Sequence, residues 1–518
     1  MDKLGNIKVY RGNPLIMGAT VMGDNVNFAI TAKYGSKCEV ILYRKGEDRE
    51  AFRIPFENAQ VIGSVYAMCV TGLDYKKYDY NFCVNDEIIV DKYAKALSGK
   101  KQWGEKSKNL RAGIVSNEYD WQDDAPLNIP FDETILYRLH VRGFTKHVSS
   151  KVKHKGTYLG IVDKIPYFKE LGITMIELMP AYDFNEIKSR PATSMKGQFS
   201  IEEPKLNYWG YTDGSMEFFF PEQTNPKEIL DCLHYWVMEY HIDGIHVNLE
   251  SAVMRMVQTD NLLCTTKIFT YSFATDTDFY NSATEVRNLA NFNDDFMIAT
   301  RRFIKGDEDM LSTIAYKVKA NPPAVAIVNY VANHNTFTLY DSVSYDRKYN
   351  QPNGENNRDG AVYNYSWNCG AEGDTRKRKI MDLRKKQIKN ALSLVFLSQG
   401  VPMLYAGDEM CNSQKGNNNP YCLDNEISWT NWNKTAMAKE IFEFTKNIIK
   451  FRKEHKVLHM KNETRQMDYK SYGLPDMSYH GTKAWYGDFS HFNRHFSTMY
   501  CGKYAMDETG SDEADMYI

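Results

Sequence analysis

Cysteine, histidine and acidic side chains are the residues of this 518-residue chain that could bind a metal or act as nucleophiles. Its nine cysteines form no Cys-x-x-Cys pair and show no Cys/His ligand spacing, so we expect free thiols rather than a zinc site or a disulfide framework. Gly416 to Asn419 form a polar run without an acidic cluster, which favours a structural turn over a metal or anion loop. The sequence therefore predicts no metal and no cofactor.

Aromatic residues are a second chemical feature. They make up 13% of the chain, with 35 tyrosines, and Tyr208, Trp209 and Tyr211 stand close together. Aromatic rings stack well on sugars, but they also fill protein cores. Both interpretations stay open for these three residues.

The charge balance excludes some classes of partner. The chain has 64 basic and 66 acidic residues, a formal net charge of -2, which argues against nucleic acid or a membrane surface as a partner. The first residues lack the apolar stretch of a secretion signal, and the apolar stretch from Ala391 to Ala406 is too short and too interrupted to span a bilayer. We expect a soluble cytoplasmic protein.

The elements that must position any site change in type along the chain. Residues 1–100 favour a β-sandwich, because β-forming runs such as Val26 to Ile30 and Val40 to Tyr43 alternate with glycine turns. Residues 101–130 are polar and are typical of a linker.

From residue 131 onward, strand-type and helix-type patterns alternate. Strand-type runs occupy 135–141, 173–179, 244–249, 267–273, 325–331 and 401–406, and helical faces occupy 161–171, 229–240 and 388–396. Repeated strand-helix units predict a parallel sheet, and their number favours a (β/α) barrel over residues 131–455. Residues 456–518 predict a short, partial C-terminal β-domain.

Several longer strings carry a resemblance to a known family. They are residues 137–145 (YRLHVRGFT), 207–211 (NYWGY), 364–370 (NYSWNCG), 407–409 (GDE) and 416–421 (GNNNPY). With these strings the chain resembles the α-amylase superfamily, glycoside hydrolase family 13, in its glycogen-debranching, isoamylase and pullulanase branch. The segments 18–20 and 26–29 resemble carbohydrate-binding module family 48.

The resemblance implies an α/β fold, a TIM-like (β/α)8 barrel between an N-terminal β-sandwich and a C-terminal β-domain. It also implies α-glucan as the partner, since family members cleave α-1,6 branch linkages with retention of configuration. That chemistry uses a nucleophilic carboxylate and a carboxylic acid about 5–5.5 Å apart. A third carboxylate stabilises the distorted sugar, and all three lie at the carboxyl ends of barrel strands.

This sequence departs from the family at each of these positions. Where the family's nucleophile strand reads Asp-Gly-Phe-Arg-Phe-Asp, residues 243–248 read DGIHVN, which places Asn248 at the nucleophile and His246 at the supporting arginine. The general-acid position falls on Tyr271. The third carboxylate follows a histidine in the family, and here Asn335 follows His334.

A larger departure precedes the helix that starts near Lys227. The family has a helix and a strand between the segment matching Phe218 to Pro221 and this helix, but only residues 222–225 and the helix start fill the interval here. We therefore expect a degenerate barrel that lacks about one β/α unit. Because barrel tilt and shear are linked, the loss leaves a gap or a local rearrangement.

These substitutions predict weak or absent hydrolysis. An amide is a poor nucleophile, and tyrosine, with an ordinary pKa near 10, is a weak acid for a leaving sugar. Losing one member of a catalytic set costs about 10⁴-fold, or about 5 kcal/mol of transition-state stabilisation. We expect a pseudoenzyme that binds α-glucan or regulates an unidentified protein partner.

Two alternatives stay open. Glu250 lies two residues beyond Asn248, on the same face if the strand continues, and could rebuild an active α-1,6-glucan hydrolase. A decayed homologue that binds nothing is the other. The expected glucan-binding residues, by resemblance, are His334, which hydrogen-bonds the sugar, Tyr211, which stacks on it, and the neighbouring Trp209, Tyr208 and His246.

Overall fold

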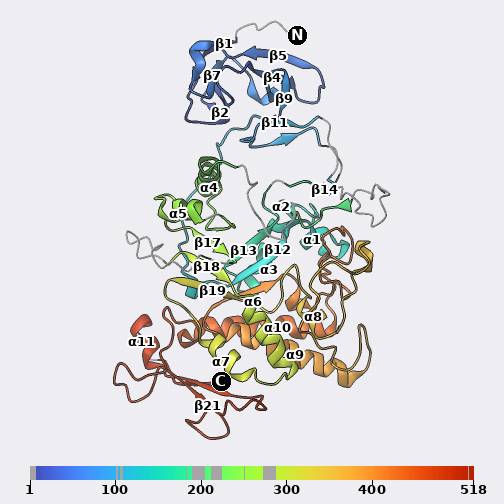
Figure 1. Cartoon of the computed structure of the whole chain (residues 1–518), viewed down its shortest axis with the longest axis vertical. Coiled ribbons are helices and arrows are strands. Elements are labelled where there is room, and N and C mark those ends of the chain that lie inside the picture. The colour runs from blue at the N-terminus through green and yellow to red at the C-terminus, as the bar shows by residue number, and fades with distance from the viewer. Residues whose placement is uncertain are drawn as a thin grey trace, which may run out of the picture. The chain divides into compact units, whose positions relative to one another are not determined.

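The computed structural model describes most of the chain in two compact units, Met1–Ala125 and Pro126–Ile518 (Figure 1). The described residues are 7–100, 103–104, 109–182, 184–188, 205–211, 224–249, 251–271, 273, 287–510 and 513–518. Glu250 and residues 218–223 lie outside them, so the expectations for Glu250 and for this interval remain predictions.

The first unit contains two antiparallel sheets. One has the order β1-β7-β3-β2 with β6 beside β7, and the other has the order β10-β11-β8-β4-β5 with β9 beside β8. The strands are β1 (Lys8–Arg11), β2 (Gly18–Met22), β3 (Asn25–Thr31), β4 (Cys38–Arg44), β5 (Glu50–Pro55), β6 (Val61–Ile62), β7 (Val65–Thr71), β8 (Tyr78–Val84), β9 (Glu87–Ile89), β10 (Leu97–Ser98) and β11 (Arg111–Gly113).

Both sheets contribute to one apolar core. Phe28 of β3, Leu42 of β4 and Phe82 of β8 are fully buried in the same cluster, as expected for a sandwich. The strands predicted from Val26 and Val40 are confirmed as β3 and β4. β11 lies inside the stretch expected as a linker and pairs with β8.

The second unit is built on a seven-stranded parallel sheet. Its order is β13-β12-β20-β19-β18-β17-β16. The strands are β12 (Leu136–His140), β13 (Met175–Met179), β16 (Gly244–His246), β17 (Lys267–Thr270), β18 (Leu289–Phe292), β19 (Val325–Asn329) and β20 (Val401–Tyr405). Their largely buried apolar side chains explain why most of them could be recognised as continuous runs in the sequence.

In the part of the chain that the structure describes, the sheet is an open, barrel-like sheet of seven strands. Along the chain β13 is the second strand of the sheet and β16 the third, and these two form its edges. Between them the described residues contain only the short antiparallel pair β14 (Ile187–Lys188) and β15 (Lys205–Leu206), which is not part of this sheet. The described residues thus form a degenerate TIM-like barrel in which about one β/α unit is not seen.

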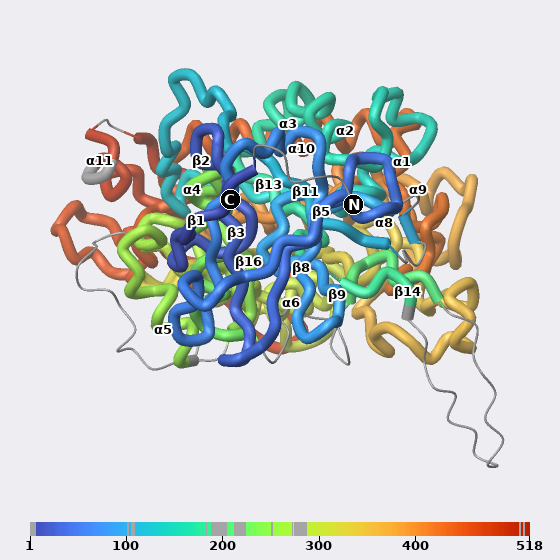
Figure 2. The backbone as a smooth tube through the Cα atoms, turned by 90° about the horizontal axis from the view of Figure 1, so that it is seen from above, coloured from blue at the N-terminus to red at the C-terminus, as the bar shows by residue number. Residues whose placement is uncertain are grey.

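Helices follow most of the strands. They are α1 (Val141–Lys146), α2 (Tyr158–Val162), α3 (Ile165–Leu171), α4 (Pro226–Tyr240), α5 (Ser251–Thr259), α6 (Asp294–Lys305), α7 (Leu311–Lys319), α8 (Leu339–Ser342), α9 (Arg378–Phe396), α10 (Ala436–Glu454) and α11 (Lys503–Thr509). α6 packs against α7 and α9, and α9 packs against α10 (Figure 1). Figure 2 shows the same backbone from above. In the part of the chain that the structure describes, no helix is long and apolar enough to cross a bilayer.

The C-terminal segment adds a small antiparallel sheet. β22 (Ser497–Tyr500) pairs with β21 (Met477–His480) on one side and β23 (Met516–Tyr517) on the other. Met477, Met499 and Tyr504 are buried in its own apolar cluster.

Candidate functional site

The parallel strands bring a buried set of polar side chains into the barrel interior. Arg138 lies on β12, Glu177 on β13 and His246 on β16, and Tyr271 directly follows β17. Barrel enzymes place their chemistry at the carboxyl ends of such strands. We call Arg138, Glu177, His246 and Tyr271, together with Asn333, the central cluster.

Glu177 is held on both of its carboxylate oxygens. Arg138 Nε donates to Oε2 at 2.7 Å, and His246 Nδ1 lies 2.6 Å from Oε1. Because β13 and β16 are the two edges of the sheet, the contact with His246 joins these edges through side chains. Burial opposes ionisation of Glu177, but the charges of Arg138 and His246 outweigh it and lower the pKa of Glu177 to about 2.

Arg138 connects Glu177 to the rest of the central cluster. Its guanidinium is fully buried, lies over the Phe292 ring at 4.2 Å, and donates through Nη1 to Asn333 Oδ1 at 2.7 Å. The same Nη1 lies 3.5 Å from the Tyr271 hydroxyl. Arg138 Nη2 and Asn333 Nδ2 are buried and have no acceptor among the described residues.

The residues expected at the family's three carboxylate positions are Asn248, Tyr271 and Asn335. His246 pairs with Phe269 in the β16–β17 register, so Asn248 and Tyr271 each lie two residues beyond this pair. Asn248 and Asn335 are half-buried. Burial raises the pKa of Tyr271, so its hydroxyl is an even weaker acid than an ordinary tyrosine.

His334 is a neutral, almost completely buried imidazole. It is 1% exposed, and its Nδ1 lies 2.8 Å from Asn333 Oδ1, which also accepts the His334 backbone N–H. Burial and the nearby positive charge of Arg138 lower its pKa well below 6.5. The ring lies 6.0 Å from Trp209 and 6.3 Å from Tyr211, so these expected glucan-binding residues do gather in one place.

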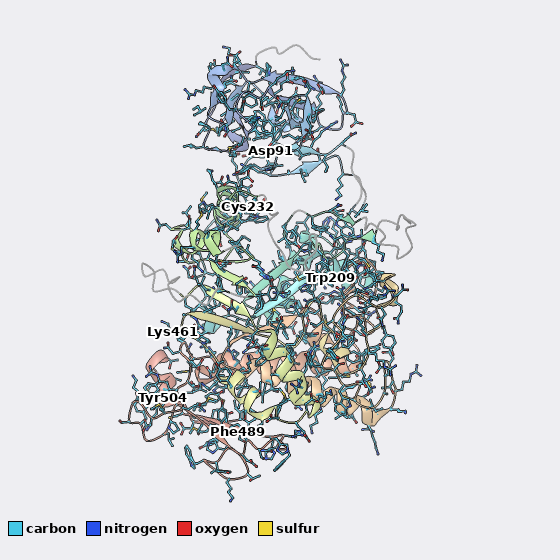
Figure 3. The ribbon with its side chains drawn as sticks, in the orientation of Figure 1. Asp91, Trp209, Cys232, Lys461, Phe489 and Tyr504 are labelled. Atoms are coloured by element: carbon cyan, nitrogen blue, oxygen red, sulfur yellow. The ribbon has the colours of Figure 1, made fainter. Side chains whose placement is uncertain are left out.

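The aromatic residues of this segment differ in burial. The side chains of Tyr208 and Trp209 are completely buried, and Tyr208 packs against His140 with ring centroids 4.1 Å apart (Figure 3 labels Trp209). Tyr211 is 7% exposed, stacks on Tyr421, and donates its hydroxyl to Asn419 Oδ1 at 3.1 Å. Of the three, only Tyr211 retains any exposed surface.

The polar run that contains Asn419 is held by other asparagines. Asn417 donates to Asn353 at 2.8 Å, and Asn418 donates to Asn364 at 2.7 Å. These amides are buried and bind one another. Hydrogen bonds between amides therefore hold this run in place, and it positions the acceptor of Tyr211.

Other acidic residues near the barrel hold loops. Glu409 accepts hydrogen bonds from the hydroxyls of Tyr137 and Tyr167, and Asp408 accepts the backbone N–H of Leu339 at 2.8 Å. Burial raises the pKa of Asp408 to about 8. Both carboxyl groups are thus bound by donors of the protein itself.

Comparison with known proteins gives consistent matches. Isoamylase SU1 of Zea mays is 27% identical and covers 87% of this chain and 75% of that protein. The glycogen operon protein GlgX homolog of Haemophilus influenzae is 29% identical, and the match covers 86% of this chain and 85% of that protein. No protein-family model matches the chain.

Solved structures of pullulanases share the fold. The enzyme of Paenibacillus barengoltzii without ligand covers 98% of this chain and 87% of its own, with a TM-score of 0.68 and 16% identity. For the type I enzyme of Bacillus subtilis, complexed with maltose, the match covers 98% of this chain and 78% of that enzyme's chain, with a TM-score of 0.65 and 19% identity.

Proposed function

We propose that this chain, which belongs to the isoamylase, GlgX and pullulanase branch of the α-amylase superfamily, binds α-glucan without hydrolysing it efficiently. Its relatives are isoamylases and glycogen operon proteins, and pullulanases of the same fold have been solved with maltose. In this proposal the chain is a glucan-binding or regulatory pseudoenzyme that acts in the cytoplasm.

The observation that carries the proposal is the engagement of Glu177. It is the carboxylate of the central cluster, and both of its oxygens are bound by Arg138 and His246. A retaining glycosidase needs one carboxylate free to attack the sugar and a second one protonated to release the leaving group. A group with a pKa of about 2 cannot be that acid near neutral pH.

The family positions supply no substitute. Asn248 and Asn335 carry amides, and Tyr271 holds its proton more tightly than usual. The cost of losing even one catalytic member is about 10⁴-fold in rate. Efficient hydrolysis therefore has no acid and no nucleophile among these groups.

Several features support retained binding. Arg138 Nη2 and Asn333 Nδ2 are donors to which a sugar hydroxyl can supply an acceptor. We assign direct sugar contacts to His334 and Tyr211, backed by the buried rings of Trp209 and Tyr208. The sugar must displace the groups that cover these side chains.

The experiment measures retention and cleavage on the same sample. Purified protein is passed over immobilised glycogen and incubated with pullulan and maltooligosaccharides while reducing ends are counted. We expect retention that soluble maltooligosaccharide competes away, and reducing ends at the level of the buffer blank. Tyr211→Ala is expected to weaken retention, and Tyr316→Ala, at an exposed tyrosine of α7, serves as the control.

Two outcomes contradict the proposal. Release of reducing ends that disappears in Glu177→Gln or Glu250→Gln would establish an active hydrolase with a rebuilt carboxylate pair. Absence of both retention and release would favour the decayed homologue.

A further inference from the structure

A cavity in the C-terminal segment lies outside the barrel site. Its volume is about 320 Å³, within the range of small-molecule sites. Met460 and Tyr500 form buried parts of its lining, and Tyr504, labelled in Figure 3, forms another. Arg465, Tyr469 and Lys470 are exposed parts of the lining. The cavity therefore combines a buried interior of mixed polarity with two exposed cationic side chains, Arg465 and Lys470.

The acidic residues of this cavity are already bound by donors of the protein. Glu463 accepts the Lys319 ammonium at 3.0 Å. Asp476 accepts the backbone N–H groups of Arg465 at 2.6 Å and of Met477 at 2.8 Å. Both carboxylates thus fix the cavity wall, Glu463 through an ion pair and Asp476 through backbone N–H groups.

Arg465 is held in a different way. Its guanidinium lies over the Tyr469 ring at 4.4 Å, and the Tyr469 ring packs against Tyr504 at 4.9 Å. The Tyr504 hydroxyl donates to Asp468 Oδ1 at 2.9 Å, which fixes the stack. Among the described residues no carboxylate forms an ion pair with Arg465. A stacked arginine keeps its N–H edge in the plane that suits two phosphate oxygens.

We propose that this cavity binds a phosphomonoester carried on a sugar ring. The phosphate pairs with Arg465 and gains from the charge of Lys470, while the sugar ring and its substituent fill the space beside Tyr504 and Met460. Two sources share this chemistry, a hexose phosphate and a nucleoside monophosphate. This site does not depend on glucan binding in the barrel.

The test is calorimetric titration of the full chain with glucose 1-phosphate, AMP and inorganic phosphate. We expect saturable one-to-one binding of at least one of the first two, tighter than that of inorganic phosphate. The compound that binds identifies the source. Arg465→Ala should weaken binding by about tenfold or more, because it removes charge-assisted hydrogen bonds. Arg465→Lys should weaken it less, since the charge remains. Arg376→Ala, at another exposed arginine, is the control and should leave binding unchanged.

Three results would overturn the proposal. The first is that neither sugar phosphate binds saturably. The second is that inorganic phosphate binds as tightly as both sugar phosphates do. The third is that Arg465→Ala binds the sugar phosphate as tightly as Arg376→Ala does. Because Arg465 is exposed, its variants are expected to unfold at the wild-type temperature, which thermal denaturation verifies.

Discussion

Replacing Glu177 by glutamine tests the electrostatics of the central cluster. The change keeps the shape of the side chain but removes the charge that Arg138 and His246 bind. The pKa of Glu177 falls from its ordinary 4.5 to about 2 in the folded protein. A carboxyl group with a depressed pKa stabilises the fold above its unfolded pKa, and that stability is lost as the pH falls through the folded pKa.

The size of the effect follows from this shift. At pH 7 the full difference of about 2.5 pKa units corresponds to about 3 kcal/mol, and at pH 3 only about 1 kcal/mol remains. We therefore expect Glu177→Gln to lower the free energy of unfolding by about 3 kcal/mol at pH 7 and by about 1 kcal/mol at pH 3. The loss at pH 7 agrees with the usual cost of breaking a buried ion pair.

Urea titration followed by tryptophan fluorescence measures both values. Glu170→Gln is the control, because Glu170 forms an exposed ion pair with Lys446 and should change the free energy of unfolding by less than about 1 kcal/mol. A variant at Glu177 that is as stable as the wild type at pH 7 would refute the reasoning. So would a loss of the same size at both pH values.

Three further changes give distinct expectations. Trp209→Ala removes a fully buried indole and should lower the free energy of unfolding by about 3–5 kcal/mol in urea titrations, and a loss below about 1 kcal/mol would contradict its packing. Arg301→Met leaves three backbone carbonyl groups without the donor that the buried guanidinium provides, and should lower the free energy of unfolding by about 2–3 kcal/mol. An unchanged urea midpoint would contradict the stabilising role of these hydrogen bonds. Asn248→Asp alone should leave reducing-end release from pullulan at the blank level, because Tyr271 supplies no acid, and a measurable gain would reveal another proton donor.

Much of the barrel could be predicted from the sequence because buried parallel strands are short apolar runs between turns. β12, β13, β19 and β20 lie within the predicted ranges. β18 was not predicted, since its four residues stand out neither by length nor by periodicity. The loss of a unit could be expected because the interval before α4 is shorter than in the family that the chain resembles. The order of the seven strands in the sheet could be seen only in the structure.

The site was only partly predictable. The family resemblance pointed to Asn248, Tyr271 and His334, but it gave no role to Glu177. Glu177 is 39 residues from Arg138 and 69 from His246, so no local pattern connects them. A single charge within the apolar run 175–179 was the available signal, because a buried charge requires a partner. The burial of Trp209 depends on packing between distant segments, which sequence alone does not fix.

The most direct test of the central claim is a titration of the wild-type chain with a maltooligosaccharide that carries one α-1,6 branch. The heat of binding is measured, and the ligand is then recovered and sized by chromatography. We predict saturable binding and recovery of the intact branched ligand. Recovery of linear products would contradict the account, and so would the absence of any binding.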